Sequence, residues 1–565
     1  MKMEYAMNNT RTAQLELLTK DPQQWDLVVV GGGITGAGIF REAAHLGLKV
    51  LLVEQKDFAW GTSSRSSKMV HGGLRYLGSG QFGLANDSVK ERQNLMAELP
   101  GLVDPLPFMM GHYEGVFPGP WIFNKLLAIY DFMAGKRYRR FFRKGIRDYL
   151  IPGMNTTHLK GATQFADAVT DDARLVMRVI QAGQADKGVA INYLKAVEVL
   201  KDTNSSQQHV TGLVLKDVET GTTIQISAKA VINATGAWTD ELRMMMGAGQ
   251  VIRPLRGSHL VVPHWRLPVA FSVSFFHPKD KRPVFVFPWE GVTVIGTTDL
   301  DHHADSAKEA SISDIETTYL LEAVNQQFPE SQLNKQDIRS TWSGVRPVVS
   351  KKSASKKCDS KKSMGKQNPE TDQSVDLSKP AKPSDEKREH AVWDDSGLIS
   401  VAGGKLTTYR LIAMDVLKKA APYLKISVAS LNESSHFVAI KDLESIGINL
   451  TSHAKHRLQG RYGEHVPSIY KLINDMPSMA EKIGTTDTLW AELAWACRSE
   501  SVLHLDDLLL RRTRIALLLE QGAEAFMPKI KEICQNYLGW DESKWQAEYV
   551  RFQKILHKHY AVPES

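Results

Sequence analysis

The sequence predicts an α/β protein with a parallel sheet assembled from distant parts of the chain, an antiparallel β domain and a C-terminal α-helical domain. Residues 26–54 have the pattern of a buried strand, a glycine turn, a helix and a second buried strand. The apolar runs within 229–238 and 397–410 each end in a loop of small residues, as strands do at the ligand-binding edge of a parallel sheet. From about residue 430, apolar residues recur with helical spacing.

The length of 565 residues exceeds what one hydrophobic core usually supports, so we expect several domains. Segments that belong to one domain are separated along the chain, because the strand patterns of the parallel sheet are far apart. The expected parts are an N-terminal extension, 1–25; a discontinuous parallel-sheet domain, 26–95, 160–248 and 390–425; a second domain, 96–159 and 249–389; and a helical domain, 430–565.

Two segments of the second domain have distinctive compositions. β-Branched and aromatic residues within 282–300 flank Glu290 and Gly291, so we predict an antiparallel hairpin with these two residues in the turn. Residues 351–387 are rich in Lys, Ser and Pro and contain no aromatic residue. We therefore predict an inserted, solvated loop, whose role the sequence leaves open.

Composition indicates the cellular compartment of the protein and excludes some kinds of binding site. The three cysteines, Cys358, Cys497 and Cys534, show no CxxC spacing, so we expect a reducing cytoplasm and no metal. Residues 1–25 lack the apolar core of a secretory signal, and no apolar run approaches the roughly 20 residues that span a bilayer. The net charge of +7 suits an anionic membrane or an anionic substrate, whereas nucleic-acid binding is disfavoured because no recognition fold accompanies it.

A glycine motif indicates a dinucleotide. Gly31, Gly33 and Gly36 form GxGxxG between the first predicted strand and helix, and Glu54 ends the next strand. Such glycines let the backbone approach a pyrophosphate at the helix N-terminus, and an acid at this distance binds the adenosine ribose. Context makes this motif a strong indication of a Rossmann-like domain, although Glu54 does not distinguish NAD from FAD.

The next loop favours FAD. Residues 61–77, GTSSRSSKMVHGGLRYL, supply small hydroxyls and bare backbone directly after the ribose-binding acid. A nicotinamide enzyme has no obvious use for a second polar loop here, whereas the ribityl chain and ring of a flavin need many hydrogen-bond donors and close backbone approach.

This loop resembles the signature of FAD-dependent, quinone-linked glycerol-3-phosphate dehydrogenases and the related glycerophosphate oxidases. Further matches occur in family order over nearly the whole chain: VTDDARLV at 169–176, NATGAW at 233–238, RGSHLVVP at 256–263, VIGTTD at 294–299, WSGVRPV at 342–348, GGKLTTYR at 403–410 and LLRRTR at 509–514. The resemblance implies a Rossmann-like FAD-binding domain and an antiparallel substrate domain of D-amino-acid-oxidase-like architecture. It also implies a C-terminal α-helical domain after these two domains.

The resemblance also assigns residues to the cofactor. The pyrophosphate is expected on the three motif glycines and the ribose on Glu54, while a helix N-terminus would face the flavin ring near residue 405. The other residues expected at the cofactor are Thr62, Ser63, Ser64, Lys68, Gly72, Leu74, Ala196, Gly236, Gly403, Lys405, Leu406 and Thr407.

The implied substrate is sn-glycerol 3-phosphate, a dianion with a secondary alcohol at C2. Its site needs cations for the phosphate and a base for the hydroxyl proton. Arg346 and Arg388 match the phosphate-binding arginines, and Tyr76 and Thr298 are the expected hydroxyl donors. His259 is the preferred base, with Lys405 as the alternative. Arg75 or Lys405 would hold the developing alkoxide.

The predicted reaction is oxidation to dihydroxyacetone phosphate by hydride transfer to FAD, with electrons passing to a membrane quinone. An oxidase that makes hydrogen peroxide is the nearest alternative, and a non-catalytic FAD-binding protein of the membrane surface is a remote one. Residues 121–151 interleave basic and aromatic residues, so they suit the headgroup region of an anionic membrane or a cover over the protein's own core. We expect peripheral attachment to the cytoplasmic face of the membrane, with the homodimer left open.

Overall fold

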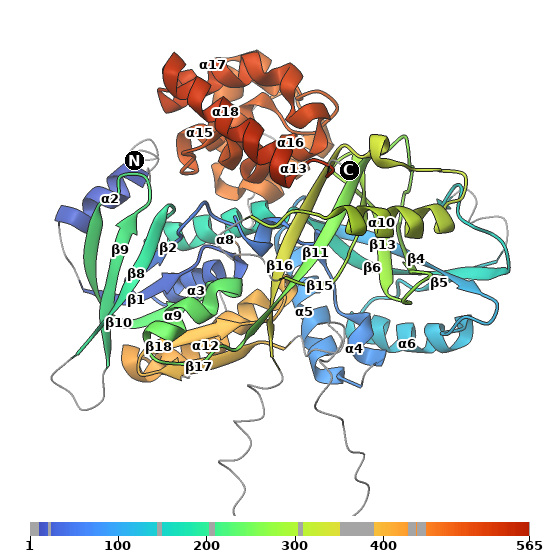
Figure 1. The fold of residues 1–565 in the computed structure, drawn as a ribbon, viewed down its shortest axis with the longest axis horizontal. Coiled ribbons are helices and arrows are strands. Elements are labelled where there is room, and N and C mark those ends of the chain that lie inside the picture. The colour runs from blue at the N-terminus through green and yellow to red at the C-terminus, as the bar shows by residue number, and fades with distance from the viewer. Residues whose placement is uncertain are drawn as a thin grey trace, which may run out of the picture.

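Two large β-sheets lie side by side, and a group of C-terminal helices covers one end of both (Figure 1). The computed structural model describes residues 11–20, 24–78, 80–143, 150–202, 209–302, 309–350, 389–427, 437 and 448–563. The predicted insertion 351–387 and the substrate residue Arg388 lie outside these ranges.

The first sheet is built on the parallel strands that the sequence predicts. β1 (Trp25–Val30) lies between β10 (Thr223–Asn233) and β2 (Val50–Val53), and β18 (Leu398–Ala402) extends the sheet beyond β10. β7 (Val189–Ile191) follows β2, and all these neighbours run parallel. The carboxyl ends of β1, β2, β10 and β18 therefore meet at one edge of the sheet.

Helices and a β-ribbon cover the two faces of this sheet. On one face, α3 (Ile34–His45) packs between α8 (Asp172–Ala185) and α12 (Tyr409–Leu424) over a shared hydrophobic core. On the other face, the antiparallel strands β8 and β9 continue from β10, and Leu18 of α2 joins their core. The remaining elements are α2 (Arg11–Lys20), β8 (Leu194–Lys201), β9 (Val210–Asp217), α9 (Thr239–Met245) and the antiparallel edge strand β17 (Ala391–Asp395).

The second sheet is antiparallel apart from one parallel neighbour pair, β4 (Val103–Tyr113) and β12 (Ser272–Phe276). α10 (Asp314–Gln327) packs on one face through Leu320, Ala323 and Val324. β13 and β14 form the predicted hairpin, with Glu290 and Gly291 between them. The strands are β3 (Met69–Val70), β4 (Val103–Tyr113), β5 (Arg140–Phe142), β6 (Leu159–Thr170), β11 (Ile252–Pro263), β12 (Ser272–Phe276), β13 (Pro283–Trp289), β14 (Val292–Gly296), β15 (Leu300–Asp301) and β16 (Ser340–Val349).

The domain boundary expected at residue 160 is wrong for β6. We assigned 160–248 to the parallel-sheet domain, but β6 pairs with β4 along its whole length and belongs to the second sheet. β3, expected in the first domain, also joins the second sheet through β6. The sequence of β6 has the pattern of a buried strand, which fits either sheet, so only its observed pairing with β4 shows which sheet it belongs to.

The C-terminal helices pack on the second sheet. Their core is continuous with Trp289 and Trp342 of β13 and β16, so the helical domain and this sheet share one hydrophobic cluster. The helices are α13 (Ser452–Tyr462), α14 (Val466–Asp475), α15 (Trp490–Ser499), a π-helical turn (Asp507–Arg512), α16 (Ile515–Leu518), α17 (Met527–Leu538) and α18 (Glu542–His559).

Candidate functional site

The glycine turn after β1 requires bare backbone. Gly31 has a φ of +114°, and a Cβ atom there would lie 2.5 Å from the carbonyl oxygen of Ala234. A Cβ atom on Gly36 would lie 1.9 Å from the carbonyl oxygen of Gly31. The first turn of α3 therefore packs directly against the strand ends, leaving its N-terminal amides at the edge of the sheet.

Glu54 and Ser63 fix the surroundings of this turn. The Glu54 carboxylate accepts hydrogen bonds from the backbone N–H of Gly32 at 2.7 Å and of Lys56 at 2.9 Å. Burial raises the pKa of Glu54. The Ser63 hydroxyl accepts from the N–H of Ile34 at 2.9 Å, close to Gly33, where a Cβ atom would be 3.1 Å from Ser63 Oγ.

The loop 61–76 connects the two sheets. Thr62 donates its hydroxyl proton to the carbonyl of Val345 in β16. Ser67 is hydrogen-bonded to His259 of β11 at 2.9 Å. Thr407, at the entry to α12, donates to the carbonyl of His71 at 3.1 Å. The loop thus lies between the strand ends of the first sheet and the long strands of the second.

His259 is buried beside this loop. Its ring stacks on Trp342, with centroids 5.0 Å apart, and its Nδ1 has no hydrogen-bond partner within the described ranges. Burial, together with the positive charges of Arg346 and Lys68, lowers the pKa of His259 well below its usual range. The imidazole is therefore neutral at pH 7, as a proton acceptor must be.

Arg346 lies on β16 beside β11. Its guanidinium is paired with Asp299 at 2.8 Å and donates to Thr297 Oγ1 at 3.2 Å. A Cβ atom on Gly257 would lie 2.6 Å from Arg346 Nη2, so the glycine makes room for the guanidinium. Thr298, expected to donate to the substrate, instead donates its hydroxyl proton to the buried Glu316 at 2.7 Å.

Lys405 and Tyr76 meet on the other side of the loop. The Lys405 ammonium lies 3.7 Å from the centroid of the Tyr76 ring and donates to Ser88 Oγ at 3.2 Å. A Cβ atom on Gly73 would come within 2.9 Å of Lys405 Nζ. Arg75, the neighbour of Tyr76 in α4 (Leu74–Gly78), has an exposed side chain.

The other expected cofactor residues fall into two groups. Four surround the strand ends: Gly236 after β10, Gly403 and Leu406 between β18 and α12, and Ala196 in β8. Around Gly236, which has a φ of +62°, a Cβ atom would meet only Pro347 at 4.0 Å, so space remains in front of this loop.

The second group lies along the loop itself. The Lys68 ammonium is buried and donates to Asp172 at 2.8 Å and to the carbonyl of Ser64 at 2.6 Å, so its side chain serves the protein's own packing. Gly72 donates its N–H to Asp167 at 3.0 Å, and Leu74 begins α4.

Three residues that contact His259 and Arg346 were not predicted to do so from the sequence. Ser67 and Trp342 contact His259, and Asp299 holds Arg346. All three lie inside motifs that the sequence displays, SSRSS, WSGVRPV and VIGTTD. Their motif positions were a usable signal, but which side chain faces which required the pairing of β11 with β14 and β16.

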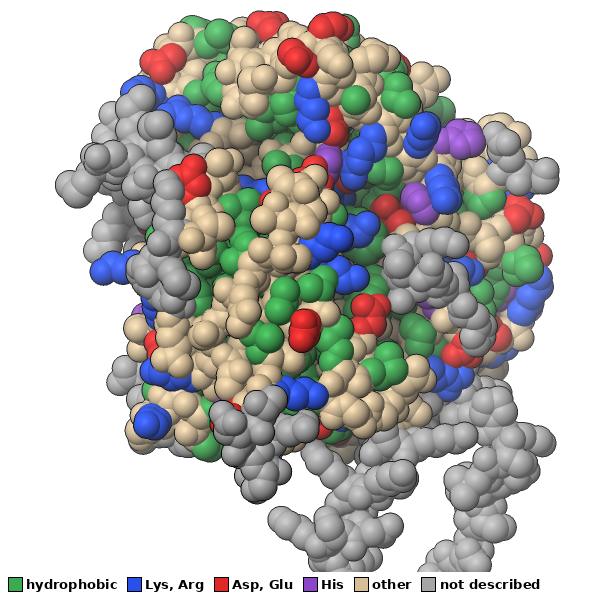
Figure 2. All heavy atoms as spheres, turned by 60° about the vertical axis from the view of Figure 1, so that its left-hand side comes forward, with side chains coloured by type: hydrophobic (Ala, Val, Ile, Leu, Met, Phe, Trp, Pro, Cys, Tyr) green, Lys and Arg blue, Asp and Glu red, His purple; other side chains and the backbone are tan. Residues whose placement is uncertain are grey.

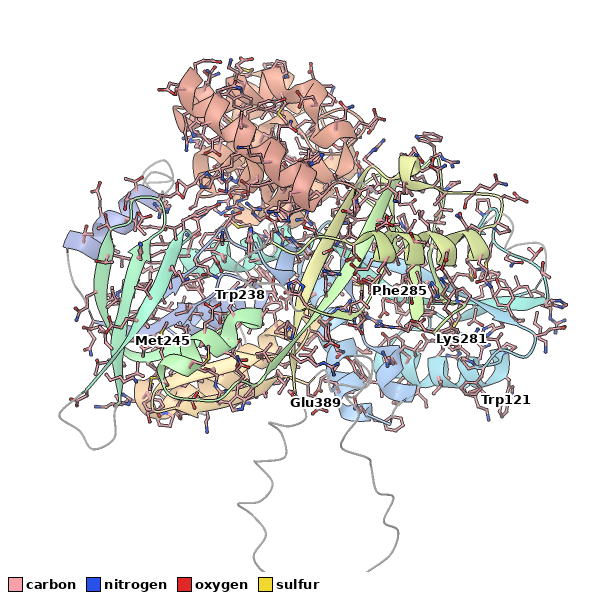
Figure 3. The ribbon with its side chains drawn as sticks, viewed as in Figure 1. Trp121, Trp238, Met245, Lys281, Phe285 and Glu389 are labelled. Atoms are coloured by element: carbon pink, nitrogen blue, oxygen red, sulfur yellow. The ribbon has the colours of Figure 1, made fainter. Side chains whose placement is uncertain are left out.

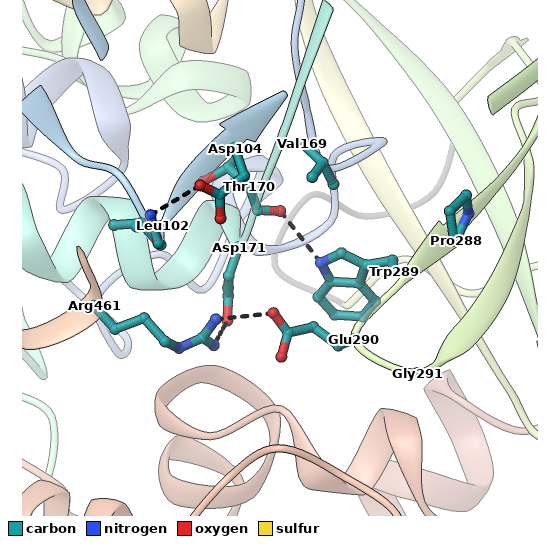
Figure 4. A pocket seen from close by; sticks show the side chains of 11 residues that line it. Leu102, Asp104, Val169, Thr170, Asp171, Pro288, Trp289, Glu290, Gly291 and Arg461 are labelled. Atoms are coloured by element: carbon teal, nitrogen blue, oxygen red, sulfur yellow. Dashed lines mark hydrogen bonds and ion pairs between the residues drawn. The ribbon is translucent and has the colours of Figure 1, made fainter. Parts of the chain in front are cut away.

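Two cavities lie near these elements. A small one, of about 50 Å³, borders Thr62 and is walled by Trp60 and Trp238, whose rings are 5.8 Å apart. A larger one, of about 190 Å³, lies where the helical domain meets the sheets (Figure 4). Its Arg461 is ion-paired with Asp171 and Glu290, so we assign no ligand to it.

The arrangement fits FAD. Close-approach glycines, an acid at the end of β2, a polar loop and the N-terminus of α12 follow the carboxyl edge of one parallel sheet, the place where such folds bind dinucleotides. Strands of a second sheet bring a neutral histidine to the same loop, and the positive charge of Arg346 acts on that histidine. These features define a dinucleotide-dependent oxidoreductase with a separate substrate domain.

Comparison with known proteins names the family. Residues 26–366 match the family model described as FAD dependent oxidoreductase, and residues 418–545 match the C-terminal domain of alpha-glycerophosphate oxidase. The chain belongs to this family of FAD-dependent oxidoreductases, and FAD is its cofactor.

Individual relatives extend over nearly the whole chain. The aerobic glycerol-3-phosphate dehydrogenase of Staphylococcus haemolyticus is 32% identical over 529 residues, 89% of each chain. The alpha-glycerophosphate oxidase of Streptococcus pneumoniae is 31% identical, covering 94% of this chain and 96% of its own. The crystal structure of the Bacillus halodurans glycerol-3-phosphate dehydrogenase with FAD superposes with a TM-score of 0.73 at 26% identity, covering 97% and 98% of the two chains.

Proposed function

We propose that this protein oxidises sn-glycerol 3-phosphate at C2 to dihydroxyacetone phosphate. The observation that carries the proposal is that one loop, 61–76, contacts His259 through Ser67, the backbone next to Arg346 through Thr62, and Lys405 through Tyr76. The proposal is supported by relatives named for this substrate that match the chain over most of its length. FAD, when bound, supplies the acceptor for the hydride that leaves C2.

The phosphate is proposed to bind at Arg346. This guanidinium is partly exposed and is anchored by Asp299, so its positive charge is held in place where a dianion can approach it. The Tyr76 hydroxyl and Arg75 are the proposed companions from the loop and α4. Thr297, whose Oγ1 contacts Arg346, replaces Thr298 as the proposed hydroxyl neighbour.

His259 is the proposed base for the C2 hydroxyl proton. Its neutral ring has one nitrogen on Ser67 and another, Nδ1, without a hydrogen-bond partner among the described residues. A dianion paired with Arg346 would offset the positive charge that lowers the pKa of His259, so substrate binding strengthens the base. Lys405 remains the alternative base, and in the main scheme it stabilises the developing alkoxide.

The proposed electron acceptor is a membrane quinone, reached by docking on the cytoplasmic face of the membrane. Searched over the ranges the structure describes, no helix has the length and apolar content to cross a bilayer. α6 (Pro120–Met133) exposes four large apolar side chains at positions 121, 122, 129 and 132, which lie on one side of the helix. We define the α6 surface as Trp121, Ile122, Ile129, Phe132, Lys125, Lys136, Arg137 and Arg140.

The α6 surface suits an anionic lipid interface. Trp121 and Phe132 are 68% and 87% exposed, and Trp121 lies at the outer edge of the molecule (Figure 3). Lys125 lies over the Trp121 ring at 3.6 Å, and three further basic residues follow the helix. Buried Phe123, Leu127 and Tyr130 hold the opposite side of the helix against the protein. Apolar insertion flanked by positive charge is the pattern of a peripheral membrane helix.

Transfer of electrons to oxygen is the second candidate, because the Streptococcus pneumoniae relative is named an oxidase and the C-terminal domain matches that of an oxidase. The test is to supply glycerol 3-phosphate to the holoenzyme with a soluble quinone analogue, with and without vesicles of anionic lipid, and to measure dihydroxyacetone phosphate and peroxide. Quinone-dependent turnover without stoichiometric peroxide is the expected result. Stoichiometric peroxide, undiminished by quinone removal, would replace the quinone proposal with the oxidase.

A further inference from the structure

The LLRRTR motif at 509–514 lies outside the site described above, yet it supplies some of the most deeply buried charges of the protein. Arg511, Arg512 and Arg514 are each 1% exposed. All three belong to the helical domain, at the π-helical turn and the residues that follow it. Ion pairs this deep are costly to desolvate, and apolar side chains of similar volume often stabilise a fold equally well. Because stability alone does not account for such charges, we ask which residues they hold.

Two of these arginines converge on one carboxylate. Arg512 binds Asp57 with both Nη atoms at 2.7 Å, and Arg511 Nε binds it at 2.5 Å. Asp57 is fully buried and also accepts from the Asn192 side chain at 3.1 Å. Burial opposes ionisation of Asp57, but the two guanidinium groups outweigh it and lower its pKa. The contact is thus a fork-shaped, charge-assisted clamp.

Asp57 begins the segment that follows the ribose-binding acid. It comes three residues after Glu54, whose carboxylate accepts from the N–H of Lys56. Two residues further on, the N–H of Ala59 donates to the carbonyl of Gly32 at 2.9 Å, within the glycine turn. A displacement of Asp57 would therefore move both the ribose acid and the backbone that faces the pyrophosphate.

The third arginine holds the far end of the same segment. Arg514 Nη2 donates to the carbonyl of Ser64 at 2.7 Å and approaches Asp172 at 3.3 Å. Asp172 in turn accepts from the N–H and the hydroxyl of Ser66 at 2.9 and 2.7 Å. One six-residue motif thus fixes residues 57 and 64–66, on either side of Thr62 and Ser63.

We propose that Arg511, Arg512 and Arg514 are positioning residues for FAD, which clamp the loop 57–66 in its cofactor-binding conformation from the helical domain. The inference rests on the assignment of FAD to this loop and needs no assumption about the substrate. It gives the helical domain a part in cofactor binding, because its arginines hold Asp57 and Ser64 of the loop. Figure 1 shows this domain above the two sheets, and in the space-filling view of Figure 2 several Lys and Arg side chains are visible near the middle of the face turned forward.

The test compares three Arg→Lys variants in the full-length protein. Arg512→Lys and Arg514→Lys keep the charge but lose the fork that bridges two acceptors. Arg457→Lys is the matched control, because Arg457 is also buried in the helical domain and pairs with Glu492 at 2.7 Å. Among the described residues its side-chain partners are Glu290, Glu492 and Thr488, none of which belongs to the loop. For each variant, the dissociation constant of FAD is measured by reconstituting the apoprotein, and the circular dichroism of the bound flavin and the Tm of the apoprotein are recorded.

The clamp predicts a dissociation constant about tenfold or more higher in Arg512→Lys and Arg514→Lys than in Arg457→Lys, since a lost charge-assisted hydrogen bond has an effect of this size. It also predicts an altered flavin circular dichroism in those two variants alone. If all three variants lower the apoprotein Tm but bind FAD with equal affinity and an unchanged flavin spectrum, the arginines only stabilise the fold and the proposal is wrong.

Hydrogen exchange of the wild-type apoprotein provides the second measurement, should a variant fail to fold. A clamped loop predicts that the amides of residues 59–66 exchange as slowly as those of α15, without FAD present. Rapid exchange of these amides beside a protected α15 would overturn the proposal. Neither measurement uses glycerol 3-phosphate, so a wrong substrate assignment would leave both outcomes unaffected.

Discussion

At the scale of single residues, the chemistry of His259 comes from its neighbours. Ser67 occupies Nε2, Trp342 covers the ring, and Arg346 adds a positive charge that disfavours protonation. A histidine buried in this way stays in its basic form to lower pH than a solvated one. Burial also raises the free energy of the protonated imidazole, and the negative charge of a bound dianion would lower it.

The pH dependence of flavin reduction follows from this environment. A base must be deprotonated, and the pKa of His259 is lowered, so the base form persists below pH 6.5. We expect kcat/KM for anaerobic flavin reduction to stay level down to about pH 6.5 and to fall only below it. A fall already complete at pH 7 would contradict the buried, neutral histidine.

Replacement of the base tests its role. His259→Ala should retain FAD and reduce the rate of flavin reduction by about 10²–10⁴-fold, as loss of a general base does. Stopped-flow absorbance measures the rate, and the flavin content of the purified variant serves as the control for binding. Reduction at the wild-type rate would remove His259 as the base and favour Lys405.

Arg346 is expected to act on binding. Arg346→Gln should weaken substrate affinity by about 1.5–3 kcal/mol, because a hydrogen bond between charged groups is lost. The control is Arg253→Gln, which breaks a comparable ion pair between Arg253 of β11 and Asp301 of β15. Equal affinities in both variants, measured by titration of the flavin spectrum, would contradict the phosphate role.

At the scale of elements, the glycine turn and α3 form one unit. Gly36→Ala should abolish FAD binding or folding, since its Cβ would lie 1.9 Å from the Gly31 carbonyl oxygen, a backbone atom that cannot yield. Gly83→Ala is the control, because a Cβ there meets nothing within 4 Å in α5 (Phe82–Glu98). Flavin content and Tm measure the outcome, and a Gly36→Ala variant with normal flavin content would contradict the close approach.

The α6 surface makes a second prediction at this scale. Replacing Trp121 and Phe132 together by Ser should abolish sedimentation with anionic vesicles while preserving flavin reduction, because both side chains are exposed. A matched double variant, Trp265→Ser with Ile315→Ser, removes equally exposed apolar side chains at 76% and 78% exposure elsewhere. If both double variants bind vesicles as the wild type does, the α6 surface is not the membrane contact.

At the scale of the whole molecule, the sequence predicted the parallel sheet well because its strands end in recognisable loops. β10 and β18 begin about 200 and about 370 residues after β1, yet the three strands lie next to one another in the sheet in the order β18, β10, β1. The assignment of β6 failed because strand pairing over long range leaves little local trace. FAD and the family were predictable from the motifs, as the family match confirms.

The sequence suggested candidate site residues but not their contacts. Motif positions identified His259, Arg346 and Lys405, but the burial of His259 and the diversion of Thr298 to Glu316 depend on how β11, β14 and α10 meet. Arg511 and Arg512 bind Asp57 across 454 and 455 positions of sequence, so no local sequence pattern predicts this contact. Roles of residues that act across domains required the assembled structure.

The central claim is that this flavoprotein takes its hydride from a phosphorylated secondary alcohol. Its most direct test is anaerobic addition of glycerol 3-phosphate to the purified holoenzyme, with the flavin absorbance followed in time and glycerol, lactate and glycine added in parallel samples. Our account predicts that glycerol 3-phosphate bleaches the flavin and that the unphosphorylated compounds do not. A flavin that stays oxidised with glycerol 3-phosphate, while glycerol, lactate or glycine reduces it, would contradict the account.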